Sequence, residues 1–158
     1  MLPKIETILY CTGMGPNAPH VFRHAYALAR QSGARIVALH VIETLSPRQR
    51  ALVEGYSGLG SLTEILRQAE REAARQLPQR IEALCAREAP DEDWRATVAE
   101  TVVAEGHVAD QILEHVGSKG ADLVVVGIHG ASSLTLGSTA RRLVKECPVP
   151  VVTVRVTD

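Results

Sequence analysis

The chain has 158 residues, 46% of them hydrophobic and 22% charged, so we expect a single globular domain over residues 1–158. Aromatic residues make up 3% and the formal net charge is −1, which argues against base stacking and against bulk attraction to nucleic acid or membranes. No apolar run is long enough for a membrane span, no signal-peptide pattern opens the chain, and the three cysteines are widely spaced. We therefore expect a cytoplasmic protein with no nucleic-acid or membrane partner.

The first part of the chain alternates between strand-like and helix-like patterns. A short apolar run at residues 7–12 predicts a buried strand, and helical apolar spacing after Pro19 predicts a helix that ends at Gly33. Residues 35–42 predict the second strand. Residues 43–60 are expected to form a long loop, of the kind that is functional or mobile in compact domains.

The alternation continues in the rest of the chain. Ser61 and Glu64 form a capping-box pattern that predicts the start of a second helix. Pro78 predicts a kink or break in that helix, because proline lacks the backbone donor and clashes with the preceding turn. The remaining expected elements are a strand over 94–104, a short helix ended by Gly117 and Gly120, a strand over 122–127, a helix over 138–146 and a strand over 148–156.

Strands that alternate with helices indicate an α/β protein with a Rossmann-like, doubly wound parallel sheet and helices on both faces. The run at 122–127 has no polar alternation, which indicates burial on both faces, as in a parallel sheet. Ligands of such sheets bind at the carboxyl ends of the strands, where the strand order reverses. Chemistry is therefore expected near residues 12–13, 41–42 and 127.

Two glycine segments follow strands that end at this edge. Gly13 and Gly15 lack the third glycine of the dinucleotide fingerprint, so alone they predict a tight turn. The second segment consists of Gly127, Ile128, His129 and Gly130, then six residues, then Gly137, Ser138 and Thr139 at the start of a helix. Free backbone N–H groups at a helix N-terminus form an anion site.

Two readings of this second segment stay open. In one, a phosphate binds at the helix N-terminus and offsets the unfavourable position of Arg141 and Arg142 one turn further on. In the other, Ser138 only caps the helix and both arginines are solvated.

The histidines also admit both a structural and a ligand-binding interpretation. His20 and His24 have the i, i+4 spacing of a metal-binding pair, but without a third ligand they indicate a polar helix face and no protein-held metal. His40 is expected to be a satisfied core histidine. His129 is the histidine that is placed where a ribose or phosphate would bind.

At this point the chain resembles the universal stress proteins over nearly its whole length. The most specific pieces are Asp122-Leu123-Val124-Val125-Val126-Gly127-x-His129-Gly130 and Cys147-Pro148-Val149-Pro150-Val151. Further pieces are Ala25 to Ala29 ahead of Gly33-Ala34, Leu39-His40-Val41, and Val102 to Gly106 followed by Ile112.

The resemblance implies a five-stranded parallel sheet in the order 3-2-1-4-5 and a homodimer paired through the C-terminal strand. It also implies ATP or another adenine nucleotide as ligand, with Mg²⁺ as a companion of the phosphates. Carried over to this chain, Val41 meets the adenine edge and Thr12 and Gly13 line the same pocket. The residues that would hold the ribose and phosphates are Gly127, His129, Gly130, Gly137, Ser138 and Thr139.

The chain departs from the nucleotide-binding pattern at two places. ATP-binding members have nine residues before the last glycine, whereas this chain has six between Gly130 and Gly137, a difference close to one helical turn. Those members also carry Asp where this chain has Gly13, so the pocket loses a carboxylate that helps to position the ribose or a metal.

Three functions follow from these residues. The first is a universal stress-like regulatory or sensor protein that binds an adenine nucleotide, which closes the 43–60 and 131–136 loops over the pocket. The alternative is a dimeric interaction module that binds an unidentified protein and no nucleotide. The third is an enzyme, at most a very slow ATPase, because the chain has no P-loop lysine and no nucleophile elbow.

Overall fold

The computed structural model describes residues 1–57, 60–129 and 137–156. The strands are β1 (Thr7–Cys11), β2 (Arg35–Glu43), β3 (Val98–Gly106), β4 (Leu123–His129) and β5 (Val151–Val156). The helices are α1 (Ala18–Ser32), α2 (Pro47–Ser57), α3 (Gly60–Glu88), α4 (Val108–Lys119) and α5 (Ser138–Glu146), with a 3₁₀ turn at Trp94–Ala96.

The five strands form one parallel sheet in the order β3-β2-β1-β4-β5, which confirms the predicted fold and strand order. β1 is central, and its last residue, Cys11, lies opposite Leu39 on β2 and Val126 on β4. From β1 the chain winds to β2 and β3 on one side and to β4 and β5 on the other. The strand order therefore reverses between β1 and β4.

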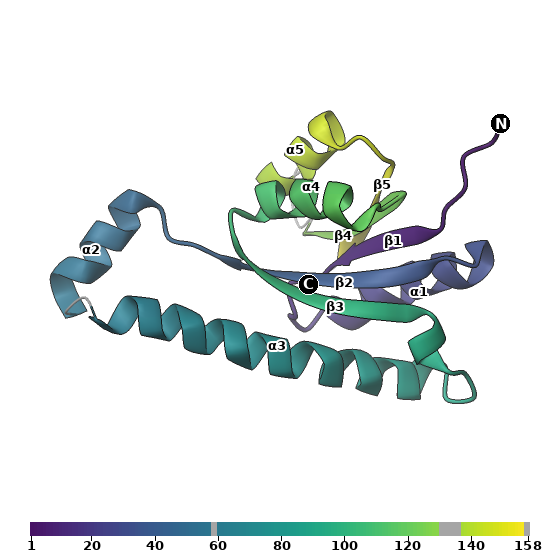
Figure 1. Ribbon diagram of the computed structural model, residues 1–158, viewed down its shortest axis with the longest axis horizontal. Helices are drawn as coiled ribbons and strands as arrows, with labels where there is room; N and C mark the ends of the chain where they lie inside the picture. Colours follow the sequence, from purple (N-terminus) through teal and green to yellow (C-terminus); the bar gives the residue numbers. More distant parts are fainter. Residues whose placement is uncertain (58–59, 130–136, 157–158) are drawn as a thin grey trace.

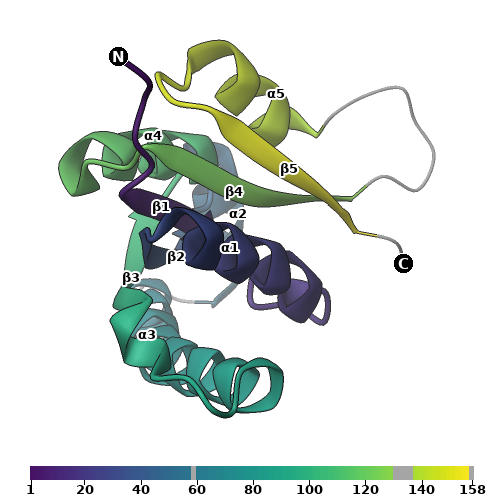
Figure 2. The same cartoon turned by 90° about the vertical axis from the view of Figure 1, so that its right-hand side faces the viewer.

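Helices cover both faces of the sheet (Figures 1 and 2). α1 and α3 pack on one face, where the core includes Tyr10, Phe22 and Ile81. α4 and α5 pack on the other, where the core includes Ile112 and Leu143. Because helices cover both faces, β4 has apolar residues on both sides. Its neighbouring residues Val124 and Val125 point to opposite faces, and both are buried.

Glycines end two of the helices as the sequence predicts. Gly33 follows α1 with φ 72°, and Gly120 follows α4 with φ 61°, both in the left-handed region that favours glycine. Gly117, which was also expected to end a helix, lies inside α4.

The long loop expected over residues 43–60 is wrong, because the segment contains helix α2. Ser46 and Gln49 form a reciprocal capping box: the Gln49 amide donates to Ser46 Oγ at 3.2 Å, and the Ser46 amide donates to Gln49 Oε1 at 2.9 Å. Pro47 then occupies the first position of the helix, where proline is tolerated. These local signals are present in the sequence and outweigh the loop-like glycines that follow.

Two further predictions differ from the structure. The break predicted at Pro78 does not occur: α3 continues from Gly60 to Glu88, and Leu77, Ile81 and Cys85 anchor the turns around the proline in the core. The strand expected from Trp94 begins at Val98, since Asp93 accepts a hydrogen bond from the Arg95 amide and starts a 3₁₀ turn instead. The predicted capping box involves the side chain of Ser61, which is not among the described side chains.

The first half of α3 extends beyond the sheet toward α2 (Figure 1). We call α2 together with residues 60–76 of α3 the α2–α3 arm. Leu52 on α2 and Ile65 on α3 are 58% and 55% exposed, whereas Leu77, at the start of the core-facing half, is 2% exposed. Within the described ranges, no helix combines the length and the apolar character needed to cross a bilayer.

Candidate functional site

The predicted site residues come from three elements that end at one edge of the sheet. Thr12 and Gly13 follow β1, Val41 lies near the end of β2, and Gly127 and His129 lie near the end of β4. Gly137, Ser138 and Thr139 begin α5. Gly130 and residues 131–136 lie outside the described residues.

The turn between β1 and α1 is held by side chains from two directions. The Met14 amide donates to Thr12 Oγ1 at 3.0 Å, and the Arg80 guanidinium of α3 donates to the Met14 carbonyl. Met14 has φ 58°, in the left-handed region, although it is not a glycine. The sequence contains no signal for the contact with Arg80, because the two residues lie 66 positions apart.

Thr12 is buried and its polar groups are occupied within the protein. Its amide donates to the Leu39 carbonyl at 2.9 Å, and its own carbonyl lies 2.8 Å from Nδ1 of His40. Because a carbonyl can only accept, Nδ1 of His40 carries the proton in this contact. His40 is therefore the satisfied histidine that the sequence predicts, and Thr12 shapes the turn.

Gly127 is required by packing on the α1 side of the sheet. A Cβ at this position would lie 2.9 Å from Val21 Cγ2 and 3.4 Å from Val156 Cγ2. Real Cβ atoms do not approach a neighbour at 2.9 Å, so a side chain here would force Val21 to move. On the sequence alone, Gly127 is explained by the close approach of a ligand. The structure adds a second reason, which is the close contact between β4 and α1 at this position.

Gly13, Gly15 and Gly137 differ from Gly127. A Cβ added to any of them would meet no atom of the described residues within 4 Å. As far as the described ranges show, the space beside these three backbones is open, as the close approach of a ligand would require. His129 is exposed at the end of β4, and Val41 packs half-buried against the core on the α4 side.

Among the described residues, no side chain caps the N-terminus of α5. Gly137 is the N-cap residue, and the first residue of the helix is Ser138, so the reading of Ser138 as the cap is wrong. The first N–H groups of an α-helix have no partner within the helix. Together with the helix dipole, these groups form a site of positive potential at the edge of the sheet.

Arg142 is committed to carboxylates rather than solvated. Its guanidinium lies 2.5 Å from Asp110 Oδ1 on α4 and 3.1 Å from Glu146 Oε2 on α5. The hydrogen bond to Asp110, followed by the one to Glu146, raises the pKa of Arg142. This residue ties α5 to α4, so the interpretation of Arg142 as a solvated side chain is wrong.

Burial raises the pKa of Tyr10, which underlies the β1–α1 turn, to about 12. Its hydroxyl donates to the Ala18 carbonyl at 3.2 Å. In the unfolded chain, Tyr10 ionises near pH 10. The contribution of Tyr10 to the free energy of unfolding is therefore constant below pH 10 and falls as the pH rises from 10 to 12. At pH 11 the loss from this group is about 1 kcal/mol.

We expect Tyr10→Phe to remove this part of the alkaline loss. The measurement is urea unfolding of both proteins at pH 9 and pH 11. An equal loss for the two proteins would show that Tyr10 is not the group responsible.

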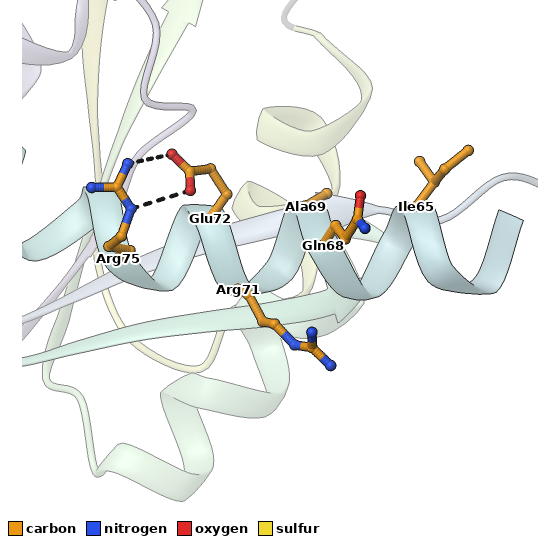
Figure 3. Close-up of a pocket in the computed structure, with 6 residues that line it drawn as sticks. All are labelled: Ile65, Gln68, Ala69, Arg71, Glu72 and Arg75. Atoms are coloured by element: carbon orange, nitrogen blue, oxygen red, sulfur yellow. Dashed lines mark hydrogen bonds and ion pairs between the residues drawn. The ribbon is translucent and has the colours of Figure 1, made fainter. Parts of the chain in front are cut away.

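A separate hollow of about 600 Å³ lies on the α2–α3 arm (Figure 3), and none of the predicted site residues lines it. Arg75 of α3 donates two hydrogen bonds to Glu72, at 2.5 and 3.1 Å, and the contact lowers the pKa of Glu72. The described residues that line it come from α3 and are Ile65, Gln68, Ala69, Arg71, Glu72 and Arg75.

The described residues contain no group of three or more His, Cys, Asp or Glu side chains that could hold a metal ion. His20 and His24 contact each other, with ring centroids 5.1 Å apart, on the exposed side of α1. Gly13 supplies no carboxylate at the edge of the sheet. The described residues of the predicted site therefore offer no carboxylate to Mg²⁺, which prefers oxygen ligands.

Comparison with known proteins agrees with this geometry. The sequence model of the Universal stress protein family matches residues 4–155. A universal stress protein of Thermus aquaticus, encoded in the QAH/OAS sulfhydrylase 3' region, is 31% identical over 153 residues, which cover 95% of this chain and 98% of that protein. Universal stress protein MJ0531 of Methanocaldococcus jannaschii is 29% identical over 136 residues, which cover 84% and 72% of the two chains.

Solved structures share the fold at lower identity. Universal stress protein UspA from Lactobacillus plantarum superposes with a TM-score of 0.69 at 22% identity and covers 98% of this chain and 100% of its own. A universal stress protein solved in complex with cAMP superposes with a TM-score of 0.57 at 19% identity, again over 98% and 100% of the two chains. On the match to residues 4–155 and the Thermus relative, the chain belongs to the universal stress protein family.

Proposed function

We propose that this protein is a dimeric regulatory protein that binds an adenine nucleotide at the carboxyl edge of β1 and β4. The adenine would lie toward Val41 on β2, and the phosphates would lie at the start of α5. The residues proposed to surround the ligand are Thr12, Gly13, Val41, Gly127, His129, Gly130, Gly137, Ser138 and Thr139.

One observation supports this proposal more than any other: no described side chain caps the N-terminus of α5, which follows β4 at the carboxyl edge of the sheet. A polyanionic ligand would satisfy the free N–H groups and interact favourably with the helix dipole. A side chain added at Gly13 or at Gly137 would meet no described atom within 4 Å, which suits the close approach of a ligand to each backbone. The cAMP complex of a related fold supports the same class of ligand, an adenine nucleotide.

The proposal assigns binding and no rapid chemistry. Residues 127–139 contain no lysine, and Arg142 is held by Asp110 and Glu146. Phosphoryl transfer depends on cations placed around the γ-phosphate, so we expect at most a very slow ATPase. Mg²⁺, where it accompanies the nucleotide, would be held by the phosphates.

The test is calorimetric titration with ATP, ADP, AMP and cAMP of the wild-type protein and of Gly137→Asp. An aspartate at this N-cap position caps α5 well and so does not lower stability, but its charge repels a phosphate. At a separation of about 4 Å in a partly solvated site, the repulsion is about 1–4 kcal/mol, which weakens ATP binding about tenfold or more.

Gly137→Asn is the matched control, since it adds a side chain of the same size that caps the helix without charge. A larger loss for the aspartate than for the asparagine variant supports a phosphate at this helix. Equal losses argue for steric exclusion and against an anion. No heat with any of the four ligands at millimolar concentration rejects the nucleotide proposal.

The exposed α2–α3 arm favours the alternative function, a dimeric module that binds a protein partner. Leu52 and Ile65 are more than half exposed, and Ile65 also lines the hollow on α3. The dimer is proposed to pair through β5, an outer strand of the sheet whose free edge can accept another strand. A protein that is dimeric by light scattering but silent in every nucleotide titration would support this alternative.

A further inference from the structure

A series of side-chain hydrogen bonds runs along α3 from the hollow to the β1–α1 turn. It begins with Arg75 and Glu72, which line the hollow and are paired in Figure 3. Gln76 Nε2 donates to Glu72 Oε1 at 2.6 Å, and Arg80 Nη2 donates to Gln76 Oε1 at 3.4 Å. Arg80 Nη1 then donates to the Met14 carbonyl. We call Glu72, Gln76 and Arg80 the α3 relay.

The relay ends on a residue whose backbone needs outside support. A non-glycine residue in the left-handed region is strained by about 1 kcal/mol or more and stays there only when its surroundings fix it. Thr12 Oγ1 accepts from the Met14 amide, and Arg80 donates to the Met14 carbonyl. Both polar backbone groups of Met14 are thus bound by side chains.

This turn joins Gly13 to Gly15, and open space lies beside both glycines. The shape of the turn sets how a ligand at the edge of the sheet meets the β1 segment. Arg80 lies on a different helix, and its guanidinium is held by Gln76 of the relay and by Met14. A change in the position of Arg80 would therefore be transmitted to the candidate binding site.

We propose that Arg80 is a positioning residue for the nucleotide site, and that the α3 relay links the hollow on the α2–α3 arm to the β1–α1 turn. The expected effect of Arg80 on nucleotide affinity rests on the proposed function, whereas its expected effect on the β1–α1 turn does not. The competing explanation is that these exposed contacts only support α3. Exposed charged contacts along a helix contribute little to stability, so the two explanations predict different measurements.

The first measurement is amide hydrogen exchange at Met14, whose amide donates to Thr12 Oγ1, in the absence of ligand. Arg80→Met removes the donor to the Met14 carbonyl while it keeps much of the aliphatic stem. We expect exchange at the Met14 amide to rise about threefold to tenfold, as for the loss of a hydrogen bond to a charged group. Arg80→Lys keeps a donor and should restore much of the protection.

Arg67→Met is the matched control, because Arg67 is an exposed arginine earlier on α3. It should leave exchange at Met14 unchanged. If Arg80→Met also leaves that exchange unchanged, the inference is wrong, whatever the protein binds. A general rise in exchange across α3 would indicate the purely supporting role and would also overturn it.

The second measurement is the affinity for ATP of the same variants. Arg80→Met is expected to raise the Kd about threefold to tenfold, while the melting temperature stays within about 2 °C of wild type. Gln76→Leu breaks the relay but keeps Arg80, so it should give a smaller loss that does not add to that of Arg80→Met. Fully additive losses would show that Arg80 acts without the relay. If the wild type binds no nucleotide, the proposed function fails and the exchange data alone decide the role of Arg80.

Discussion

Replacing Asp122 by alanine is expected to lower the free energy of unfolding by about 2–4 kcal/mol, because two charge-assisted hydrogen bonds disappear together. The Asp122 carboxylate accepts from the amides of Glu6 and Thr7, at 2.9 and 3.0 Å. The Asp122 amide in turn donates to the Thr7 carbonyl at 2.8 Å. Asp122 therefore fixes the point at which central strand β1 enters the sheet.

The measurement is urea unfolding of the wild type, Asp122→Ala and Asp122→Asn at neutral pH. The asparagine variant keeps an acceptor oxygen without the charge and should lose less than the alanine variant. Thr7 is buried, so its amide would be left without a partner in the alanine variant. A loss below about 0.5 kcal/mol, the range of ordinary surface substitutions, would show that water replaces the carboxylate.

The sheet was predictable from local patterns. Strand β4 appears as an uninterrupted apolar run, because a parallel strand between two layers of helices needs apolar residues on both faces. Helix α1 has apolar residues at helical spacing and a glycine at its end, and both features are local. Alternation of such elements restricts the topology to a few choices, and the resemblance to a family selected one of them.

The secondary-structure predictions were wrong where tertiary contacts or competing local signals determine the structure. Pro78 looks like a helix breaker, but core contacts of Leu77 and Ile81 hold the turns on either side of it. Residues 43–60 look like a loop because of their glycines, although Ser46 and Gln49 already form a capping box. The capping box was the local signal that could have identified α2.

For the candidate site, the sequence predicts no more than the sheet edge at which its segments meet. That the segments after β1 and β4 meet there follows from parallel topology. The detailed contacts do not follow from the sequence. Arg80 and Met14 lie 66 positions apart, Asp122 and Glu6 lie 116 positions apart, and no periodicity relates them. The role of Gly127 is also invisible without knowing that Val21 packs on it.

Substituting Gly127 by alanine is expected to destabilise the protein by about 1–3 kcal/mol even without ligand, because it overpacks the contact between β4 and α1. The added Cβ would lie 2.9 Å from Cγ2 of Val21, a buried and β-branched side chain with little rotamer freedom. Reduced freedom of the unfolded chain offsets only about 0.4–1 kcal/mol of this cost. The measurement is urea unfolding of the nucleotide-free protein.

The double variant Val21→Ala with Gly127→Ala separates packing from ligand binding. Val21→Ala alone creates a cavity, and the new methyl group at position 127 partly fills it. We therefore expect the double variant to be less destabilised than the sum of the single variants, by about 1 kcal/mol. If Gly127 were needed only for ligand approach, Gly127→Ala would leave the stability of the free protein unchanged and reduce nucleotide affinity alone. The unfolding data thus decide which surroundings require a glycine at this position, those of α1 or those of the bound ligand.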